Sequence, residues 1–280
     1  MKIGIIGLGL IGGSIAKSIK ENTAHTVMGH DIDPTVVHKA LLLNAIDTPL
    51  MEEDLSECDV VIVALYPKAT IDYVTKNAHL FKKGAIVMDS CGVKSVVCRI
   101  IEPLAKERDF CFIGGHPMAG TTHSGFAYSE KALFNNASMV LTPAKGTSIQ
   151  QVELIKKLCV SIGFTNTQIS TPEEHDQVIA FTSQLAHIVS NAYVKSPSAL
   201  LHKGFSAGSY VDLTRVAKLN ENMWSELFLD NKAPLIGEID GLIERLAAYK
   251  KALEADDSTE LKSLLKAGSD RKIQIDGDAN

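Results

Sequence analysis

The chain has 280 residues, of which 45% are apolar and 22% are charged, as in a soluble globular protein of one large domain or two ordinary ones. These values exclude a disordered chain, a collagen-like chain and a small scaffold held by disulfides. The 28 basic residues are fewer than the 33 acidic ones, and the net charge of −5 gives no basic excess for binding nucleic-acid phosphates.

The first thirty residues alternate between strand and helix around a glycine-rich turn. Residues 2–6 form an apolar strand, residues 14–20 a helical stretch, and residues 26–30 a second strand that ends at Asp31. Between the first strand and the helix lies Gly7-Leu8-Gly9-Leu10-Ile11-Gly12, a G-x-G-x-x-G sequence. In this context, with an acidic residue 19 positions after Gly12, such a sequence is typical of dinucleotide-binding sites.

Each glycine of this loop has a physical task. Gly7 permits the tight turn, Gly9 lets the backbone approach a pyrophosphate, and Gly12 lets helix and strand pack closely. The helix N-terminus adds N–H groups and the positive end of its dipole. The competing interpretation is a glycine turn that binds no cofactor. The predicted cofactor site consists of Gly7, Leu8, Gly9, Leu10, Ile11, Gly12, Asp31 and Leu65.

Asp31 predicts which dinucleotide is bound. Its carboxylate would accept hydrogen bonds from the adenosine ribose hydroxyls, and its charge would repel a 2′-phosphate, so we expect NAD rather than NADP. Asp33 is a weaker alternative for this role, because Pro34 follows it in what we interpret as a turn.

Strands and helices continue to alternate up to residue 170. The run 59–65 is apolar, as expected of a parallel strand that is buried on both faces. This alternation predicts an α/β fold, a doubly wound parallel sheet of Rossmann type that binds ligands at the carboxyl ends of its strands. The further strands expected are 85–89, 110–116, 138–142 and 165–169, with helices at 69–79, at 149–162 and after the loop 90–94.

From Thr171 onward the sequence predicts helices and no convincing strand. The segment 171–174 has a capping Thr, a Pro at the first helical position and a Glu three residues after the cap. Helices are expected near 172–194, 208–219, 221–229 and 232–254, and the polar tail 268–280 is expected to be loosely ordered. The predicted domains are a dinucleotide-binding domain, residues 1–170, and an all-α substrate and dimerisation domain, residues 171–280.

The last of these helices carries an apolar stripe at helical spacing. One interpretation is core packing, and the other is that part of the stripe forms a homodimer interface. Its members are Leu235, Ile236, Ile239, Leu242, Ile243, Leu246 and Leu253.

The five cysteines are scattered, odd in number and without a C-x-x-C pair. This pattern argues against a disulfide framework and a zinc site, and it suits a reducing cytoplasm. No apolar run is long enough to span a membrane, and the N-terminus lacks the cleavage site of a signal peptide. We therefore expect a cytoplasmic protein with no metal, no nucleic-acid partner and no membrane association.

His116 ends the strand 110–116, where a ligand is expected. An imidazole has an ordinary pKa of about 6.5, so this ring can take a proton from a substrate at neutral pH. The competing interpretation is a loop histidine that is hydrogen-bonded to the backbone. His175 is interpreted only as a residue of the first turn of its helix.

Several motifs together resemble the prephenate/arogenate dehydrogenase family. Besides the glycine loop they are, in chain order, Gly114-Gly115-His116-Pro117-Met118-Ala119-Gly120, Ser124-Gly125-Phe126, Glu174-His175-Asp176, Thr182-Ser183-Gln184-Leu185-Ala186-His187, Asp212-Leu213-Thr214-Arg215, Met223-Trp224 and Asn231-Lys232. The likeness covers nearly the whole chain and is more specific for the family than for the substrate.

The resemblance implies an NAD-dependent oxidative decarboxylation, in which a cyclohexadienol passes a hydride to the nicotinamide and loses its ring carboxylate as carbon dioxide. It implies that His116 accepts the hydroxyl proton, His187 helps to hold the substrate, and Arg215 binds the substrate carboxylate. Asp212 and Trp224 match residues around the same pocket. Trp224 equally suits core packing, and Asp212 also suits an ion pair with Arg215.

The sequence departs from the family pattern near the expected site. The family has Asp-x-Gly-Ser-x-Lys before the histidine strand, and its serine contacts the histidine and the substrate. Here Gly92 stands in the serine's place, and Ser90 and Cys91 are the two candidates to replace it; we assign Ser90 and Gly92 to the substrate site. Other departures are Gln184 and Ala186 for His and Pro, Thr122 for an acidic residue, and Asn220-Glu221-Asn222 for Ser-Asp-Pro.

Three functions follow as hypotheses. The first is a prephenate dehydrogenase of tyrosine biosynthesis that forms 4-hydroxyphenylpyruvate, with arogenate as the alternative substrate. The second is a β-hydroxyacid or imine-reducing dehydrogenase, although such enzymes usually rely on a lysine or aspartate in the helical half. The third is a non-enzymatic NAD sensor, supported only by the replaced serine. Since no regulatory domain follows residue 280, we expect any feedback by tyrosine to act at the substrate site.

Overall fold

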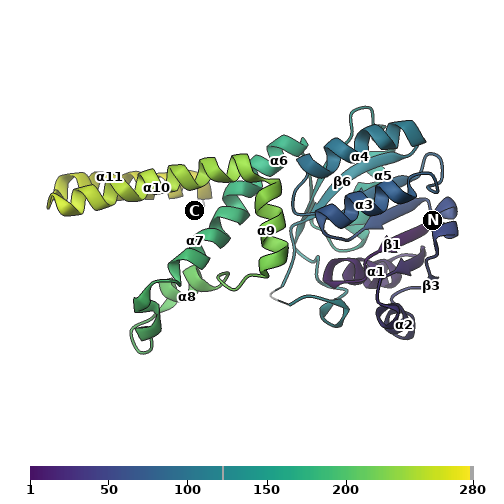
Figure 1. Ribbon diagram of the computed structural model, residues 1–280, viewed down its shortest axis with the longest axis horizontal. Coiled ribbons are helices and arrows are strands. Elements are labelled where there is room, and N and C mark those ends of the chain that lie inside the picture. Colours follow the sequence, from purple (N-terminus) through teal and green to yellow (C-terminus); the bar gives the residue numbers. More distant parts are fainter. Residues whose placement is uncertain (122, 278–280) are drawn as a thin grey trace. The chain divides into compact units, whose positions relative to one another are not determined.

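In the residues that the structure describes, 1–121 and 123–277, this computed structural model has eight strands in one sheet, in the order β3-β2-β1-β4-β5-β6-β7-β8 (Figure 1). The strands are β1 (Lys2–Ile6), β2 (Thr26–His30), β3 (Thr48–Pro49), β4 (Val60–Val63), β5 (Ile86–Asp89), β6 (Cys111–Pro117), β7 (Ser138–Pro143) and β8 (Asn166–Ile169). Between them lie α1 (Leu10–Asn22), α2 (Pro34–Leu42), α3 (Pro67–Asn77), α4 (Ser95–Arg108), α5 (Ile149–Ser161) and the 3₁₀ turns η1 (Glu52–Glu57) and η2 (Phe126–Tyr128). The predicted doubly wound α/β fold is confirmed.

The sheet changes direction at β7. Strands β1 to β6 are parallel, β7 runs antiparallel to β6, and β8 runs parallel to β7. The expectation of a wholly parallel sheet is therefore wrong at its last two strands. The described residues between β6 and β7 form loops and the short turn η2 instead of a crossover helix, so β7 returns beside β6 in the opposite direction.

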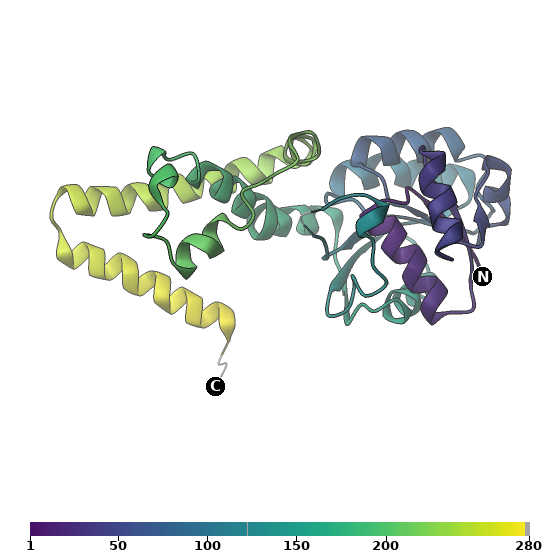
Figure 2. The same cartoon turned by 90° about the horizontal axis from the view of Figure 1, so that it is seen from below.

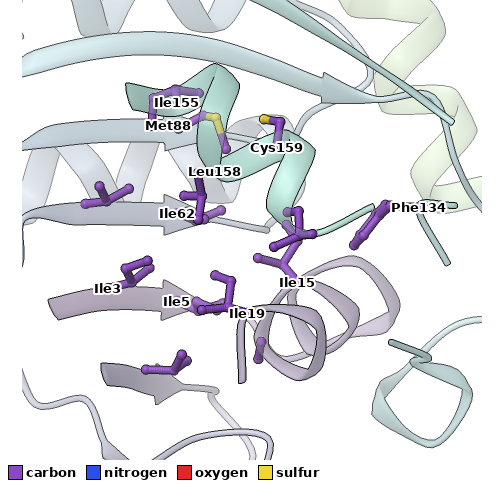
Figure 3. Packing of buried hydrophobic residues seen from close by; sticks show 14 of the residues in the cluster. Ile3, Ile5, Ile15, Ile19, Ile62, Met88, Phe134, Ile155, Leu158 and Cys159 are labelled. Carbon is purple, nitrogen blue, oxygen red and sulfur yellow. The ribbon is translucent and has the colours of Figure 1, made fainter. Parts of the chain in front are cut away.

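Alternate side chains of the strands enter two apolar clusters on opposite faces of the sheet. On β4, Val60 and Ile62 enter the first cluster, whereas Val61 and Val63 enter the second. Burial of such side chains stabilises the fold by roughly 1.5–3 kcal/mol each. Figure 3 shows the first cluster, where the sheet packs against α1 and α5 through Ile3, Ile5, Ile62, Met88, Ile15, Ile19, Ile155, Leu158 and Cys159.

The helix α2 is absent from the sequence-based prediction. Asp33 caps it by accepting a hydrogen bond from the Thr35 N–H at 2.8 Å, and Pro34 is its first residue. The turn expected at this pair is therefore wrong, because the fixed φ of proline also suits the first position of a helix. Since the Asp33 carboxylate caps α2, Asp31 is left as the acidic residue next to the glycine loop.

After β8 the described chain is helical, as predicted. The predicted helix start is also confirmed, since Thr171 Oγ1 accepts a hydrogen bond from the Glu174 N–H at 3.2 Å and Glu174 Oε2 accepts one from the Thr171 N–H at 3.1 Å. The elements are α6 (Pro172–Ile179), the π-helical η3 (Ala180–Leu185), α7 (Ala186–Tyr193), the 3₁₀ turn η4 (Pro197–Leu201), α8 (Gly208–Thr214), α9 (Glu221–Asp230), α10 (Lys232–Glu254) and α11 (Ser258–Asp276).

The polar tail forms a helix instead of a loosely ordered segment. Asp257 caps α11 by accepting hydrogen bonds from the Thr259 and Glu260 N–H groups. Lysine–aspartate pairs four residues apart, 266 with 270 and 272 with 276, then support the exposed helix. The expectation for 268–280 is therefore wrong up to Asp276, and residues 278–280 lie outside the described part.

The chain forms two compact units. The sheet unit comprises Met1–Ile179 and Lys218–Asn231, and the helical unit comprises Ala180–Ala217 and Lys232–Asn280. Thus α9 belongs to the sheet unit. These units describe contacts within the chain, and the division into functional domains at residue 171 stays a prediction. No helix in the described part of the chain is long and apolar enough to cross a membrane.

Within the helical unit, α10 and α11 form a hairpin (Figure 2). The Tyr249 hydroxyl donates to the Leu264 carbonyl at 3.2 Å across this hairpin. Of the predicted stripe, Leu235 is buried, whereas Ile236, Ile243, Leu246 and Leu253 are between 49% and 62% exposed. Core packing within one chain therefore does not account for the whole stripe.

Candidate active site

The glycine loop has no room for a side chain at two of its glycines and has free space around the third. Gly7 has a φ of +85°, and a Cβ on Gly12 would lie 1.9 Å from the Gly7 carbonyl oxygen, so neither position admits a side chain. A Cβ on Gly9 would meet no described atom within 4 Å. Gly9 precedes α1, whose N-terminus is capped by no side chain of the described residues. This open backbone at a helix N-terminus suits a pyrophosphate.

Asp31 lies beside the loop, just after β2. Its carboxylate accepts hydrogen bonds from the Leu8 N–H at 2.8 Å and the Asp33 N–H at 3.0 Å. Leu8 packs its side chain into the first apolar cluster, so its backbone is the part available to a ligand. The residues therefore fit a dinucleotide. Of the other predicted cofactor residues, Leu65 lies against the position of a Cβ on Gly7, and Leu10 and Ile11 are half-buried at the start of α1.

Gly9→Ala is expected to weaken NAD binding by about tenfold or more without unfolding the chain. The backbone at this position has φ −74° and ψ −154°, which alanine can adopt, and its methyl group would project into open space along the path proposed for the pyrophosphate. Calorimetric titration with NAD and thermal unfolding together check this. The matched control is Gly268→Ala in α11, also in open space, which should leave NAD affinity unchanged. Equal NAD affinity in both variants would contradict the assignment of the loop.

His116 is joined by hydrogen bonds to a buried pair in α6. Its Nδ1 lies 2.8 Å from His175 Nε2, and His175 Nδ1 lies 2.7 Å from Asp176 Oδ1. The two rings meet edge to face with centroids 5.0 Å apart. His175 and Asp176 are 3% and 2% exposed, whereas His116 is half-buried. The interpretation of His175 as only a first-turn residue is therefore wrong.

Asp176 is held at the start of α4. Its Oδ1 accepts a hydrogen bond from the Lys94 N–H and its Oδ2 accepts one from the Ser95 N–H, each at 2.8 Å. Its own carbonyl accepts one from Asn231 Nδ2 at 2.8 Å. Burial opposes ionisation of this carboxyl, but the hydrogen bonds from His175, Ser95 and Lys94 outweigh it and lower its pKa. Asp176 is therefore an anchored carboxylate.

A second buried pair lies between β5 and β6. The Lys94 and Asp89 side chains are fully buried and form an ion pair, and Lys94 Nζ also donates to the Gly115 carbonyl at 2.6 Å. Asp89 accepts hydrogen bonds from the Gly115 N–H at 3.0 Å and the Cys91 N–H at 2.9 Å. Burial opposes the charge of Lys94, but the charge of Asp89 outweighs it and raises the lysine pKa. The pair thus holds Gly115, the residue directly before His116, by both its N–H and its carbonyl group.

The other nitrogen of His116 faces Gly92, where the family that the sequence resembles has a serine. A Cβ on Gly92 would lie 3.9 Å from His116 Nε2 and 3.4 Å from a methyl group of Leu227 in α9. Burial lowers the pKa of His116 well below its usual range, and the positive charge of Lys94 lowers it further. A neutral imidazole is therefore favoured at physiological pH.

Cys91 is the wrong candidate to replace the family's serine. Its thiol is 4% exposed, packs in the second apolar cluster, and lies 3.4 Å from Thr70 Oγ1 and 3.5 Å from the Leu65 carbonyl. Burial raises its pKa well above the usual value, so it stays a thiol. Ser90 is half-buried after β5, with its N–H bonded to the Val63 carbonyl at 3.2 Å. Of the two candidates, Ser90 is therefore the one retained for the substrate site.

The predicted substrate residues divide between the two units. Trp224 lies in the sheet unit, half-buried and 5.2 Å from Phe228 between ring centroids. In the helical unit, the His187 Nδ1 donates to the Ser183 carbonyl at 2.8 Å. Asp212 and Arg215 are exposed there, and no ion pair joins them in the described part of the chain. Thr122 lies outside the described residues, among which no cluster could hold a metal ion.

Comparison with known proteins identifies the family. Residues 15–166 match the family model of the prephenate dehydrogenase nucleotide-binding domain, and residues 171–267 match that of the prephenate dehydrogenase dimerization domain. The chain belongs to the prephenate dehydrogenase family. The chain is 32% identical over 275 residues to a prephenate dehydrogenase of Bacillus subtilis, a match that covers 95% of this chain and 74% of that protein.

Solved structures of two relatives have the same fold as this family member. A prephenate dehydrogenase of A. aeolicus, crystallised with hydroxyphenyl propionate and NAD+, is 29% identical, with a TM-score of 0.85 and 98% coverage of both chains. A Synechocystis arogenate dehydrogenase is 26% identical, with a TM-score of 0.83 and coverage of 98% of this chain and 100% of that one. One of these relatives is named a prephenate dehydrogenase and the other an arogenate dehydrogenase. The choice between the two substrates is therefore a proposal.

Sequence reasoning missed the residues that support His116 in this family member. His175 and Asp176 lie within the quoted motif Glu174-His175-Asp176, but the contact to His116 joins positions 59 residues apart. The signal in the sequence was an aspartate directly after a histidine, since a carboxylate can accept a hydrogen bond from an imidazole N–H. Periodicity could not show which residue the histidine meets.

Proposed function

We propose that this protein is an NAD-dependent prephenate dehydrogenase that converts prephenate into 4-hydroxyphenylpyruvate and carbon dioxide in tyrosine biosynthesis. The observation that carries the proposal is the placement of His116, which is held through Nδ1 by His175 and has Nε2 beside Gly92. The glycine loop of the same unit fits a dinucleotide. Membership in the family connects these two features to one reaction.

NAD when bound supplies a nicotinamide ring that can take up a hydride. In the proposed reaction His116 Nε2 accepts the proton of the substrate hydroxyl while the hydride leaves the same carbon, which becomes a carbonyl. The bond to the ring carboxylate then breaks, carbon dioxide leaves, and its bonding electrons make the ring aromatic. His116 returns its proton to the resulting phenolate oxygen. A positioned base of this kind contributes about 10²–10⁴-fold to the rate.

The remaining residues of the proposed site would hold the anionic substrate. Arg215 offers a planar donor fork to the side-chain carboxylate, and His187 offers a further hydrogen bond. We assign Asp212 and Trp224 to the surroundings of the substrate carboxylate. We assign Ser90 and Gly92 to the part of the proposed substrate site that is next to His116. A Cβ at position 92 would lie 3.9 Å from His116 Nε2, so the side chain at this position is next to the proposed base.

Purified protein incubated with NAD and prephenate tests the function directly through the absorbance of the reduced nicotinamide. Prephenate should be turned over, with 4-hydroxyphenylpyruvate as the product. Turnover of arogenate alone would assign the arogenate dehydrogenase alternative, which forms tyrosine directly. Turnover of a β-hydroxyacid alone would assign the second class of dehydrogenase. NAD binding without turnover of any of these substrates would favour a sensor and overturn the proposal.

Asp31→Ser should shift the cofactor preference toward NADP by about tenfold or more, measured as the ratio of kcat/KM for the two cofactors. The carboxylate beside Leu8 would repel a 2′-phosphate, and serine removes that charge. The control is Asp33→Ser, which keeps a helix cap on α2 and should leave the ratio unchanged. An unchanged ratio in Asp31→Ser would remove Asp31 from the ribose site.

We also propose a homodimer in the cytoplasm. The exposed half of the α10 stripe is the surface we assign to the second copy, and the match to a dimerization domain supports it. Five cysteines without a disulfide in the described residues suit a reducing compartment. We retain residue 171 as the start of the substrate and dimerisation domain.

A further inference from the structure

We propose that His175 and Asp176 are positioning residues that hold His116 in the tautomer with hydrogen on Nδ1 and none on Nε2. This inference rests on the proposed function, in which Nε2 of His116 must accept a proton. It assigns to the pair in α6 a task that the sequence motifs did not suggest. Two hydrogen bonds connect the buried Asp176 carboxylate to His116 through His175.

The Asp176 carboxylate determines which nitrogen of His175 carries the hydrogen. Its two oxygens accept hydrogen bonds from the backbone N–H groups of Lys94 and Ser95, and Oδ1 also meets His175 Nδ1 at 2.7 Å. An ionised carboxylate can only accept, so the hydrogen of the last contact must belong to His175 Nδ1. Nε2 of a neutral His175 then carries no hydrogen.

The tautomer of His175 in turn determines which histidine donates in the hydrogen bond between the two rings. His175 Nε2 lies 2.8 Å from His116 Nδ1, and a hydrogen bond at this distance needs one hydrogen. Because His175 Nε2 has none, His116 Nδ1 must donate. A neutral imidazole carries a single ring N–H, so His116 Nε2 is left as a bare nitrogen with its lone pair. This is the atom that lies beside Gly92.

The same chain of contacts stabilises His116 after it has accepted a proton. The imidazolium keeps its Nδ1–H bond to His175, and His175 keeps its bond to the Asp176 carboxylate. Negative charge at the end of this chain favours positive charge on His116. No proton needs to cross to His175, since orientation and charge suffice. In the alternative tautomer Nε2 would carry a hydrogen and could accept none.

The test replaces His175 and not Asp176, because Asp176 also holds the start of α4 and Asn231. His175→Phe removes the acceptor and should lower kcat by about 10²-fold or more, with KM and NAD affinity within about twofold. His175→Gln keeps a carbonyl that can accept from His116 Nδ1–H and an amide that can donate to Asp176. The kcat of His175→Gln should therefore be at least about tenfold higher than that of His175→Phe. Equal losses in both variants, or no loss in either, would overturn the proposal.

A spectroscopic measurement tests the tautomer without any substrate. With histidines labelled with nitrogen-15, the His116 resonances are identified by their absence in His116→Asn. At a pH where the ring is neutral, Nδ1 should show the shift of a protonated nitrogen and Nε2 that of a bare one, and His175→Phe should change this pattern. A protonated Nε2 in the unmodified protein would overturn the inference. Since this readout needs no turnover, it separates failure of the inference from failure of the proposed function.

Discussion

His116→Asn should lower kcat for prephenate by about 10²–10⁴-fold, while the affinity for NAD should stay within about twofold. Asparagine keeps an amide that can donate to His175 Nε2, so the contacts of α6 survive, but it has no nitrogen that accepts a proton at neutral pH. The glycine loop that we assign to NAD is built from other residues. The loss should therefore fall on the chemical step and spare cofactor binding.

Stopped-flow or steady-state kinetics, together with calorimetric titration of NAD, checks this expectation. The control is His79→Asn, at an exposed position after α3, which should leave both quantities unchanged. A loss of less than about threefold in kcat for His116→Asn would remove this residue from the chemical step. A parallel loss of NAD affinity would instead indicate that the substitution damages the sheet unit.

The parts of this fold that the sequence predicts are those specified by neighbouring residues. The apolar run through β4 and the glycine loop before α1 each follow a local rule of periodicity or backbone geometry. For the same reason the cap at Thr171 could be read from four consecutive residues. His116 was placed by a strand end, which is also a local signal.

The predictions that fail depend on contacts between distant residues or on competing local rules. At Asp33–Pro34 the same two residues suit a turn or a helix start, and the packing of α2 decides between them. The reversal of β7 depends on whether the connection after β6 crosses over the sheet before the next strand pairs, and no rule of strand periodicity encodes that choice. The alignment of His116, His175 and Asp176 depends on how α6 packs against β6, so it appears only in three dimensions.

Lys94→Met should lower the free energy of unfolding by about 3–5 kcal/mol. The Lys94 and Asp89 side chains are both 0% exposed. Removing the ammonium leaves the carboxylate buried, with the backbone N–H groups of Cys91 and Gly115 as its remaining hydrogen-bond donors among the described residues. Methionine has nearly the same length as lysine, so cavity formation contributes little. Denaturant titrations of the two proteins measure the difference.

Lys82→Met is the matched control, because its partner Asp59 forms an ion pair whose side chains are 47% and 36% exposed. Water screens that pair, so its loss should cost about 0–1 kcal/mol. The double variant Lys94→Met with Asp89→Asn should recover part of the stability lost in Lys94→Met, since a neutral amide no longer places an unpaired charge in the core. If Lys94→Met costs no more than Lys82→Met, the Asp89 carboxylate is not charged in the folded chain. The two strands around His116 would then be held together mainly by their backbone hydrogen bonds.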